Sequence, residues 1–335
     1  NNYRQMKEEI IVSGRMNLNI DPVLHIWHWQ IPLYLFLGGL ASGIMFFAAL
    51  YTIQGKEKQY QTAVKWSMFL VPIFIVLGLL MLLLDLKHKL YFWQLYTVIR
   101  LQSPMSWGAW TLMIVTPIAL LWCLMYIRDL LDLWKGKFKL TNGLIEFAYK
   151  KLDRYKWIDT FIAFLYKYRK VMAWLMIFYA VILGIYTGIL LSAFNARPLW
   201  NTSILGPLFM VSGFSTAAAL IMWMSKDYNE KKAFGRIDLI LIATEVFFII
   251  HMFMGFLAST EVQIEAARLF LGGEFTAVFW VFVVGIGLVI PALLESLKLY
   301  GFKIPVFLPA FMILLGGLMF RFIMVEAGQV TRYLY

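Results

Sequence analysis

Eight long apolar runs constrain the fold of this chain more than any other feature of its sequence. Each run holds about 20 mostly apolar residues, the length of helix that crosses the hydrocarbon core of a bilayer. The chain as a whole is 61% hydrophobic, whereas soluble domains are nearer to half. We therefore predict an all-α integral membrane protein. Its eight transmembrane helices are expected at residues 31–53, 66–84, 107–127, 171–194, 202–224, 237–257, 276–294 and 304–324.

The positive charges predict how these helices are oriented. Two thirds of the 30 Lys and Arg residues lie in the loops that follow odd-numbered runs. Cytoplasmic loops of membrane proteins are enriched in Lys and Arg, so both termini are expected outside. This topology accounts for the net charge of +11, and no basic tract with interleaved polar residues indicates nucleic-acid binding.

The loop 128–170 is the most basic part of the chain. Its segments LTNGLIEFAYKKL and WIDTFIAFLYKYRK alternate apolar and basic positions at helical spacing. This pattern is typical of helices that lie along the anionic inner leaflet, and docking of a partner is the alternative. We therefore divide the chain into an outer N-terminal segment with a helix start, 1–30, and an eight-helix membrane domain, 31–335. Within that domain, 128–170 is a basic cytoplasmic loop with interfacial helices.

A polar and aromatic segment, 85–110, separates the second and third apolar runs and has the sequence DLKHKLYFWQLYTVIRLQSPMSWGAW. Its last third predicts the start of a helix, because Ser103 can cap the helix and Pro104 suits its first turn. Trp and Tyr also anchor ordinary loops at the membrane interface. Ionisable residues at the membrane edge, however, indicate a functional site.

All four histidines are expected at the outer ends of the helices. His25 and His28 are three residues apart, so they share one face of a helix that Asp21 and Pro22 would begin. The same level of the membrane is expected to hold His88, His251, Asp85, Arg100 and Tyr186. Together these side chains predict a polar pocket on the outer side.

A quinone suits such a pocket better than a haem. It needs an apolar slot, hydrogen-bond donors and a group that accepts protons near neutral pH, which His, Asp and Tyr supply. A transmembrane dihaem protein needs His near both faces, and the inner half has none; a single outer haem remains an alternative. The one cysteine, Cys123, lies inside an apolar run, so the sequence offers no thiolate set for an iron–sulfur cluster or zinc.

Three acids in or beside the apolar runs form a candidate proton path. Asp238 and Glu245 are seven residues apart and share a helix face, and Glu295 lies at the inner end of the seventh run. Buried acids are costly unless they are paired or hydrated, and they often mark proton routes. We expect Asp238 and Glu295 to be solvated at the inner edge. Glu245 is either a proton carrier or a hydrogen-bonded packing residue.

Arg321 and Glu326 lie in the outer half of the last apolar run. A long basic side chain at this level often extends to the lipid headgroups. We expect Arg321 either to do so or to contribute to a surface for a partner.

The segment 85–110 resembles the signature of the NrfD/PsrC family, the quinone-reactive membrane subunits of polysulfide reductase and its relatives. In that pattern an Asp-Leu pair leaves the second helix, and Ser-Pro-Met-Ser-Trp-Gly precedes the third. The strings HWQIPLYLFLGGLASG, TGILLSAFNARPLWN and LLGGLMFRF agree with the family, so the resemblance extends over about 21–329. The basic loop 128–170 is longer than we expect in a minimal member of this family.

The resemblance implies two four-helix bundles and a menaquinone or ubiquinone pocket on the outer face. It also implies a four-cluster, ferredoxin-like iron–sulfur subunit docked beside the pocket, and a molybdopterin subunit that does the substrate chemistry. The family's pocket histidine best matches His28, with His25 in reserve. Its pocket tyrosine matches Tyr186 and its second-helix acid matches Asp85. His88 and Arg100 complete the quinone-binding candidates, and His28, Asp85 and Tyr186 are the catalytic ones.

We therefore expect a quinone- or quinol-binding anchor subunit of a respiratory oxidoreductase, similar to the polysulfide reductases, in a bacterial or archaeal cytoplasmic membrane. Its active face would be extracytoplasmic, and it would hold no haem, iron–sulfur cluster or metal itself. Proton translocation through Glu245, Asp238 and Glu295 is left open. The alternatives are a purely structural anchor and a secondary transporter. The transporter is less favoured because most prolines lie near helix ends, Pro117 excepted.

Overall fold

The computed structural model describes residues 26–135, 143, 146 and 154–333. Within these ranges the regular secondary structure is helical, and eight helices are long and apolar enough to cross a membrane. The predicted all-α fold with eight spanning helices is therefore confirmed. Six spans are continuous: α2 Gln30–Ile53, α5 Pro104–Met125, α9 Arg169–Ser192, α10 Leu205–Met224, α11 Tyr228–Leu257 and α15 Phe307–Val330. The second span joins η1 Thr62–Trp66, η2 Ser67–Phe69 and α3 Leu70–Asp85, and the seventh joins α13 Thr276–Val278, η4 Phe279–Val289 and α14 Ile290–Leu299.

The predicted spans overlap the observed helices, and the largest difference is at the start of α11. This helix begins at Tyr228 rather than 237, because Asp227 caps it: the Asp227 carboxylate accepts a hydrogen bond of 3.2 Å from the Asn229 N–H. A capping carboxylate satisfies one of the free N–H groups at a helix start. The polar residues that follow therefore join the helix, although their hydropathy is that of a loop.

Two of the shorter helices, α6 Ile127–Trp134 and α8 Lys156–Lys167, occupy the ends of the basic loop 128–170. An ion pair of 2.6 Å between Arg128 and Asp159 joins them. Both side chains are exposed, so the pair contributes at most about 1 kcal/mol. The expected helix at 140–152 lies mostly outside the described residues. The placement of this loop on the inner leaflet remains a prediction.

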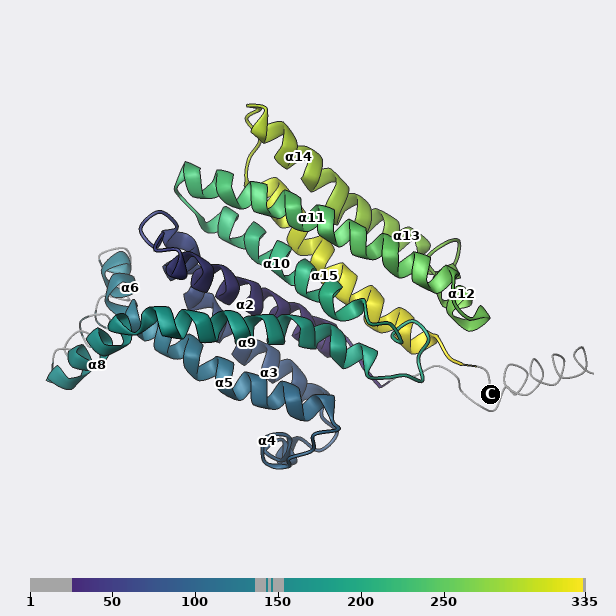
Figure 1. Ribbon diagram of the computed structural model, residues 1–335, viewed down its shortest axis with the longest axis horizontal. Coiled ribbons are helices and arrows are strands. Elements are labelled where there is room, and N and C mark those ends of the chain that lie inside the picture. Colours follow the sequence, from purple (N-terminus) through teal and green to yellow (C-terminus); the bar gives the residue numbers. More distant parts are fainter. Residues whose placement is uncertain (1–25, 136–142, 144–145, 147–153, 334–335) are drawn as a thin grey trace, which may run out of the picture.

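Helices α2 and α10 form the centre of the molecule. Helix α2 packs against α3, α9, α10 and α15, and α10 packs against α9, α11 and α15 as well. In Figure 1, α3 and α5 lie below α2 and α9, whereas α11 and α14 lie above α10 and α15. Contacts between the early and the late spans therefore pass mainly through α2, α9, α10 and α15.

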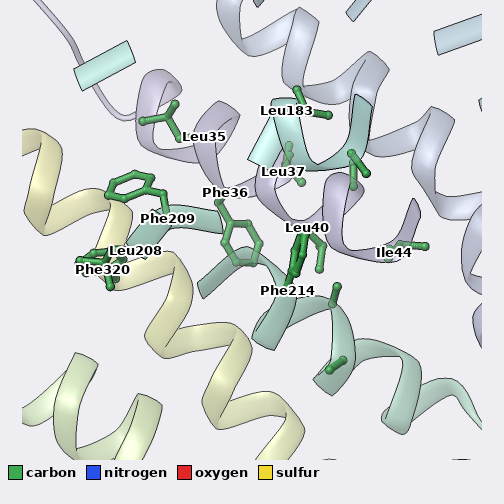
Figure 2. Packing of buried hydrophobic residues seen from close by; sticks show 14 of the residues in the cluster. Leu35, Phe36, Leu37, Leu40, Ile44, Leu183, Leu208, Phe209, Phe214 and Phe320 are labelled. Atoms are coloured by element: carbon green, nitrogen blue, oxygen red, sulfur yellow. The ribbon is translucent and has the colours of Figure 1, made fainter. Parts of the chain in front are cut away.

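Small residues allow α2 and α10 to approach closely. A Cβ atom added at Gly213 would lie 2.8 Å from the Gly39 carbonyl oxygen, and one added at Gly43 would lie 2.9 Å from the Gly213 carbonyl oxygen. Small residues are the usual means by which membrane helices reach such distances. Around this crossing, Figure 2 shows Phe36 of α2 beside Phe214 of α10, with Phe209 and Phe320 on the side of α15.

We expect the substitution Gly213→Ala to destabilise the protein, because the added methyl group would meet the Gly39 backbone, which cannot turn aside as a side chain can. The matched control is Gly255→Ala on α11, where an added Cβ has no neighbour within 4 Å and the higher helix propensity of Ala is worth up to about 1 kcal/mol. Thermal unfolding in detergent should give a lower midpoint for Gly213→Ala alone. Equal midpoints for the two variants would refute the close-contact interpretation.

Candidate functional site

One end of the helical bundle holds several of the polar residues that were predicted to form the pocket, among them His28, Asp85 and Tyr186. Here α2 and α5 begin and α3 and α9 end, and we call this the recess end. Asp85, the last residue of α3, is half-buried, and it interacts with the imidazole and the backbone N–H of His28. The His28 side chain itself is exposed. The expected proximity of a histidine and an acid at this end is therefore present in the structure.

A narrow, mostly apolar recess lies next to this pair, and three tyrosines form its polar part. Tyr34 of α2 and Tyr186 of α9 are buried, and their hydroxyl groups share a hydrogen bond. Tyr96 comes from the short helix α4 Gln94–Thr97 and interacts with Tyr34. The recess, with its open mouth, has about 380 Å³ of space. Its lining is Tyr34, Leu79, Leu82, Leu95, Tyr96, Met105, Ala109, Leu112, Tyr186 and Leu190.

The tyrosine recess and the Asp85–His28 pair are adjacent along α3. Leu82 lines the recess, and Asp85 follows it by three residues, which is less than one helical turn or about 4.5 Å along the axis. Burial raises the pKa of Tyr96, which lies outside the spanning helices. Its phenol therefore keeps its proton at neutral pH and can donate a hydrogen bond.

The string Ser-Pro-Met-Ser-Trp-Gly explains how Tyr186 reaches this position. Helix α5 begins at Pro104, as predicted, and Ser103 before it has an extended backbone. The Ser103 side chain makes no capping hydrogen bond, so that part of the prediction is wrong. One turn further, a Cβ atom at Gly108 would lie only 2.1 Å from the Cζ atom of Tyr186. Glycine at this place therefore provides the space that the Tyr186 ring occupies.

The other predicted pocket residues that the structure describes do not line the recess. His88 and Arg100 are exposed in the segment that contains η3 Lys89–Tyr91 and α4, and neither lines the recess. His251 is exposed on α11, where its Nδ1 atom lies 2.8 Å from the carbonyl oxygen of Phe247 one turn earlier. His25 lies outside the described residues.

Sequence reasoning missed Tyr34 and Tyr96. Both stand in strings that the family resemblance is based on, six residues after His28 and eleven after Asp85. The aromatics of 85–110, Tyr96 among them, were interpreted as possible anchors at the membrane interface, and Tyr34 was given no role. Only the packing of α2 against α3 and α9 indicates that Tyr34 faces inward.

Gln329 at the end of α15 fixes the chain segment that carries His28, and sequence reasoning missed it as well. Its side-chain oxygen accepts hydrogen bonds from the N–H groups of Ile26 and Trp27, at 3.2 and 2.9 Å, and its amide donates to the Trp27 carbonyl at 2.9 Å. Arg197 then donates to the Gln329 carbonyl at 3.0 Å. The entry to α2, the turn after α9 and the end of α15 are thereby joined next to His28.

The three predicted acids form a second polar group, which we call the buried acid row. Asp238 is 0% exposed, Glu245 3% and Glu295 2%, so the expected solvation of Asp238 and Glu295 is wrong. The physical reason is close packing of α11 on α14: a Cβ atom at Gly235 would lie 2.6 Å from a Glu295 carboxylate oxygen. Lys298, which was not predicted, donates to both Glu295 oxygens at 3.0 and 3.1 Å.

Each of the other two acids has a serine of α10 as a partner. The Ser215 hydroxyl donates to Asp238 at 2.7 Å. Ser212 bonds to Glu245. The second carboxylate oxygen of Asp238 is buried without a hydrogen bond to any part of the chain that the structure describes. An unsatisfied buried oxygen is costly, and Asp238 bears this cost at its second oxygen.

Arg321 is also part of this group, and both expectations for it, headgroup contact and a partner surface, are wrong. Its side chain is fully buried and donates to the Ser212 hydroxyl at 2.5 Å and to the carbonyls of Gly317 and Phe209 at 2.9 and 3.1 Å. Glu245 lies near enough to attract its charge. A charge inside a bilayer needs such partners, and these are supplied by α10, α11 and the preceding turn of α15 itself.

The family model described as polysulphide reductase, NrfD, matches residues 17–332 of the sequence, so the match includes the tyrosine recess and the buried acid row. The chain belongs to the NrfD family. The resemblance found in the sequence is thereby confirmed. Nothing in the described residues groups three or more His, Cys, Asp or Glu side chains as a metal site would.

Individual relatives of this NrfD-family protein agree with it over most of its length. A polysulfide reductase chain of Wolinella succinogenes is 30% identical over 319 residues, which are 91% of the present sequence and 94% of that relative. Protein NrfD of Escherichia coli strain K12 is 30% identical over 323 residues, 91% of the present sequence and 96% of that relative. A selenate reductase subunit of Mesobacillus selenatarsenatis is 24% identical, covering 96% of the present sequence and 78% of that relative.

The contact between Gly108 and Tyr186 gives a testable prediction. Gly108→Ala should destabilise the protein by about 1–3 kcal/mol, because overpacking forces the Tyr186 ring out of its place. In a Tyr186→Ala background the same change should cost little, since the ring is gone; residues in contact are non-additive in this way. Thermal unfolding of the four variants in detergent measures the coupling. If Gly108→Ala costs the same in both backgrounds, Gly108 has another role.

Proposed function

We propose that this chain is the quinone- or quinol-binding membrane anchor subunit of a respiratory oxidoreductase complex. The observation that carries the proposal is the apolar recess with buried tyrosine hydroxyls next to the Asp85–His28 pair. Two relatives are named as components of polysulfide and selenate reductases, which supports membership of a reductase complex. The substrate chemistry would then belong to a partner subunit.

The residues of the recess fit a quinone headgroup. Its walls are mostly leucine and other apolar side chains, which suit the ring, and the hydroxyls of Tyr34, Tyr96 and Tyr186 suit its two oxygens. The space inside the recess that the centre of a water-sized sphere can occupy is only about 20 Å³, roughly enough for one water molecule. Entry of a ring therefore requires a lining side chain to move. We expect this to be Tyr96 or Met105, because Tyr96 lies within, and Met105 close to, the largely exposed segment 86–103.

The chain's own residues have distinct tasks in this proposal. A quinol, when bound, supplies two electrons and two protons. Tyr34 and Tyr186 orient the headgroup through their hydroxyls. The Asp85 carboxylate and the exposed His28 imidazole accept protons and pass them to water, because imidazole changes its charge near neutral pH. The apolar walls keep water away from the ring.

The partners and location follow from the same proposal. Electrons pass between a menaquinone or ubiquinone pool and an iron–sulfur subunit that docks at the recess end, with a molybdopterin subunit beyond it. The recess end faces the extracytoplasmic side of a bacterial or archaeal cytoplasmic membrane, in agreement with the Lys and Arg distribution. His88 and Arg100 are exposed at this end, and there they would contact the quinone oxygens or the partner subunit.

Proton translocation through the buried acid row is a second proposed activity. It is supported by a series of polar groups that runs from the half-buried Lys298 through the buried Glu295 and Asp238 to the buried Glu245. Asp238 and Glu245 are about 10 Å apart along α11. This is longer than a single hydrogen bond, so the path also needs water between them.

We expect His28→Ala and Tyr186→Phe each to weaken the binding of a quinol analogue at least tenfold, which corresponds to about 1.4 kcal/mol. Each variant removes one polar partner of the headgroup. Fluorescence-quench titration of the purified protein measures the affinity. His251→Ala is the matched control, because His251 is exposed on α11 and bonds only to its own helix among the described residues.

Unchanged binding in His28→Ala and Tyr186→Phe would move the quinone site away from the recess. Equal weakening in His251→Ala would indicate a non-specific effect. Absence of saturable binding to the wild-type protein would favour a purely structural anchor.

For the buried acid row we expect Glu245→Gln to lower the number of protons moved per electron pair while quinol oxidation continues, because the amide cannot carry a proton. The complete complex, reconstituted in liposomes, allows both quantities to be measured. Glu326→Gln on α15 is the control, since Glu326 is an exposed acid outside the row. An unchanged stoichiometry in Glu245→Gln would rule out the conduit.

A further inference from the structure

A second cavity lies at the end of the bundle opposite to the tyrosine recess. It has a volume of about 490 Å³. The turn after α2, the start of the second span, helix α6 and the turn between α10 and α11 all contribute to its wall. Its lining residues are Lys58, Gln59, Gln61, Thr62, Trp66, Leu133, Met224, Lys226, Asp227 and Glu230. The cavity is therefore shared by the early and the late spans.

The two acids of this lining, Glu230 and Asp227, already form hydrogen bonds within the protein. The Glu230 carboxylate is 1% exposed and accepts hydrogen bonds from the Thr62 and Ala63 N–H groups, at 3.3 and 2.9 Å, and from the Ser225 hydroxyl at 2.7 Å. Asp227 caps α11. These bonds fix the wall of the cavity and give the carboxylate oxygens hydrogen-bond donors from within the fold.

The two lysines have no such partners. Lys58 and Lys226 are exposed, they come from different turns, and neither ammonium group has an ion pair or hydrogen bond within the described part of the chain. Two ammonium groups beside acids that already have donors favour an anion. Lysine ammonium groups bind phosphate oxygens as point charges.

The remaining lining is apolar and lies where the spanning helices meet their loops. Trp66, Leu133 and Met224 give the cavity an apolar side, and Trp is typical of the membrane–water interface. A free phosphate ion makes no favourable contact with an apolar wall, whereas a phospholipid has both a charged headgroup and apolar acyl chains. Basic pockets between membrane helices bind anionic lipid headgroups in this manner.

We propose that this cavity binds one anionic phospholipid, with its phosphate between Lys58 and Lys226 and the first part of its acyl chains against Trp66, Leu133 and Met224. The lipid contacts both the turn after α2 and the turn after α10. It therefore links the early and the late spans at this end of the bundle. Because it binds only the folded protein, it stabilises that state by mass action. The proposal is independent of the quinone site.

The test uses the intact protein, delipidated in detergent, with phosphatidylglycerol, phosphatidylcholine or inorganic phosphate added separately. Phosphatidylglycerol should raise the thermal midpoint, and native mass spectrometry should detect one retained lipid per protein molecule. The double variant Lys58→Gln/Lys226→Gln should bind phosphatidylglycerol at least tenfold more weakly. The matched control is Lys303→Gln, because Lys303 is exposed in the turn between α14 and α15 at the same end and does not line the cavity.

Leu133→Gln supplies a second variant that leaves both lysines in place. It should weaken the binding of phosphatidylglycerol, because it damages the apolar wall. Stabilisation by inorganic phosphate as strong as that by phosphatidylglycerol would overturn the lipid assignment in favour of a free anion. An equal loss in Lys303→Gln would overturn the site in favour of diffuse surface charge. Equal stabilisation by phosphatidylcholine would overturn the requirement for an anionic lipid.

Discussion

The close crossing of α2 and α10 is the contact on which the rest of this structure depends. Backbone approaches backbone at Gly39 and Gly213, and in a bilayer such contact replaces the hydrophobic driving force that soluble helices use. On one side of the crossing, α2 supplies Tyr34 to the recess. On the other, α10 supplies Ser212 and Ser215 to the buried acid row. Both polar sites are therefore built on the same pair of helices.

The need to satisfy polar groups away from water explains much of the remaining detail. Arg321 is fully buried because two backbone carbonyls, a serine hydroxyl and a nearby carboxylate take the place of its hydration. At the recess end, Gln329 satisfies backbone groups of Trp27 that precede the first helix and have no helical partner. Such bonds are worth more in a low-dielectric interior than at an exposed surface, and here they also position functional side chains.

The sequence predicted part of the site, and each success has a local cause. Pro104 begins α5 as expected, because helix starts depend on residues that are neighbours in the chain. The failures concern side chains whose surroundings come from distant segments. Asp238 and Glu295 were expected to be solvated, and they are buried. A position at the membrane edge in the sequence does not indicate whether another helix covers the side chain. Tyr34 was missed because its importance depends on Tyr186, which lies far along the chain.

The sequence by itself determined that this chain is helical, that it crosses the membrane eight times, and which family it belongs to. Those properties depend on hydrophobic length and on short strings of residues, and both are local quantities. Only the tertiary structure decided which polar groups meet: Tyr34 with Tyr186, Asp85 with His28, and Arg321 with Ser212 and Glu245. Contacts of this kind depend on helix rotation and on the depth of packing. In a uniformly apolar helix, hydropathy carries little information about either.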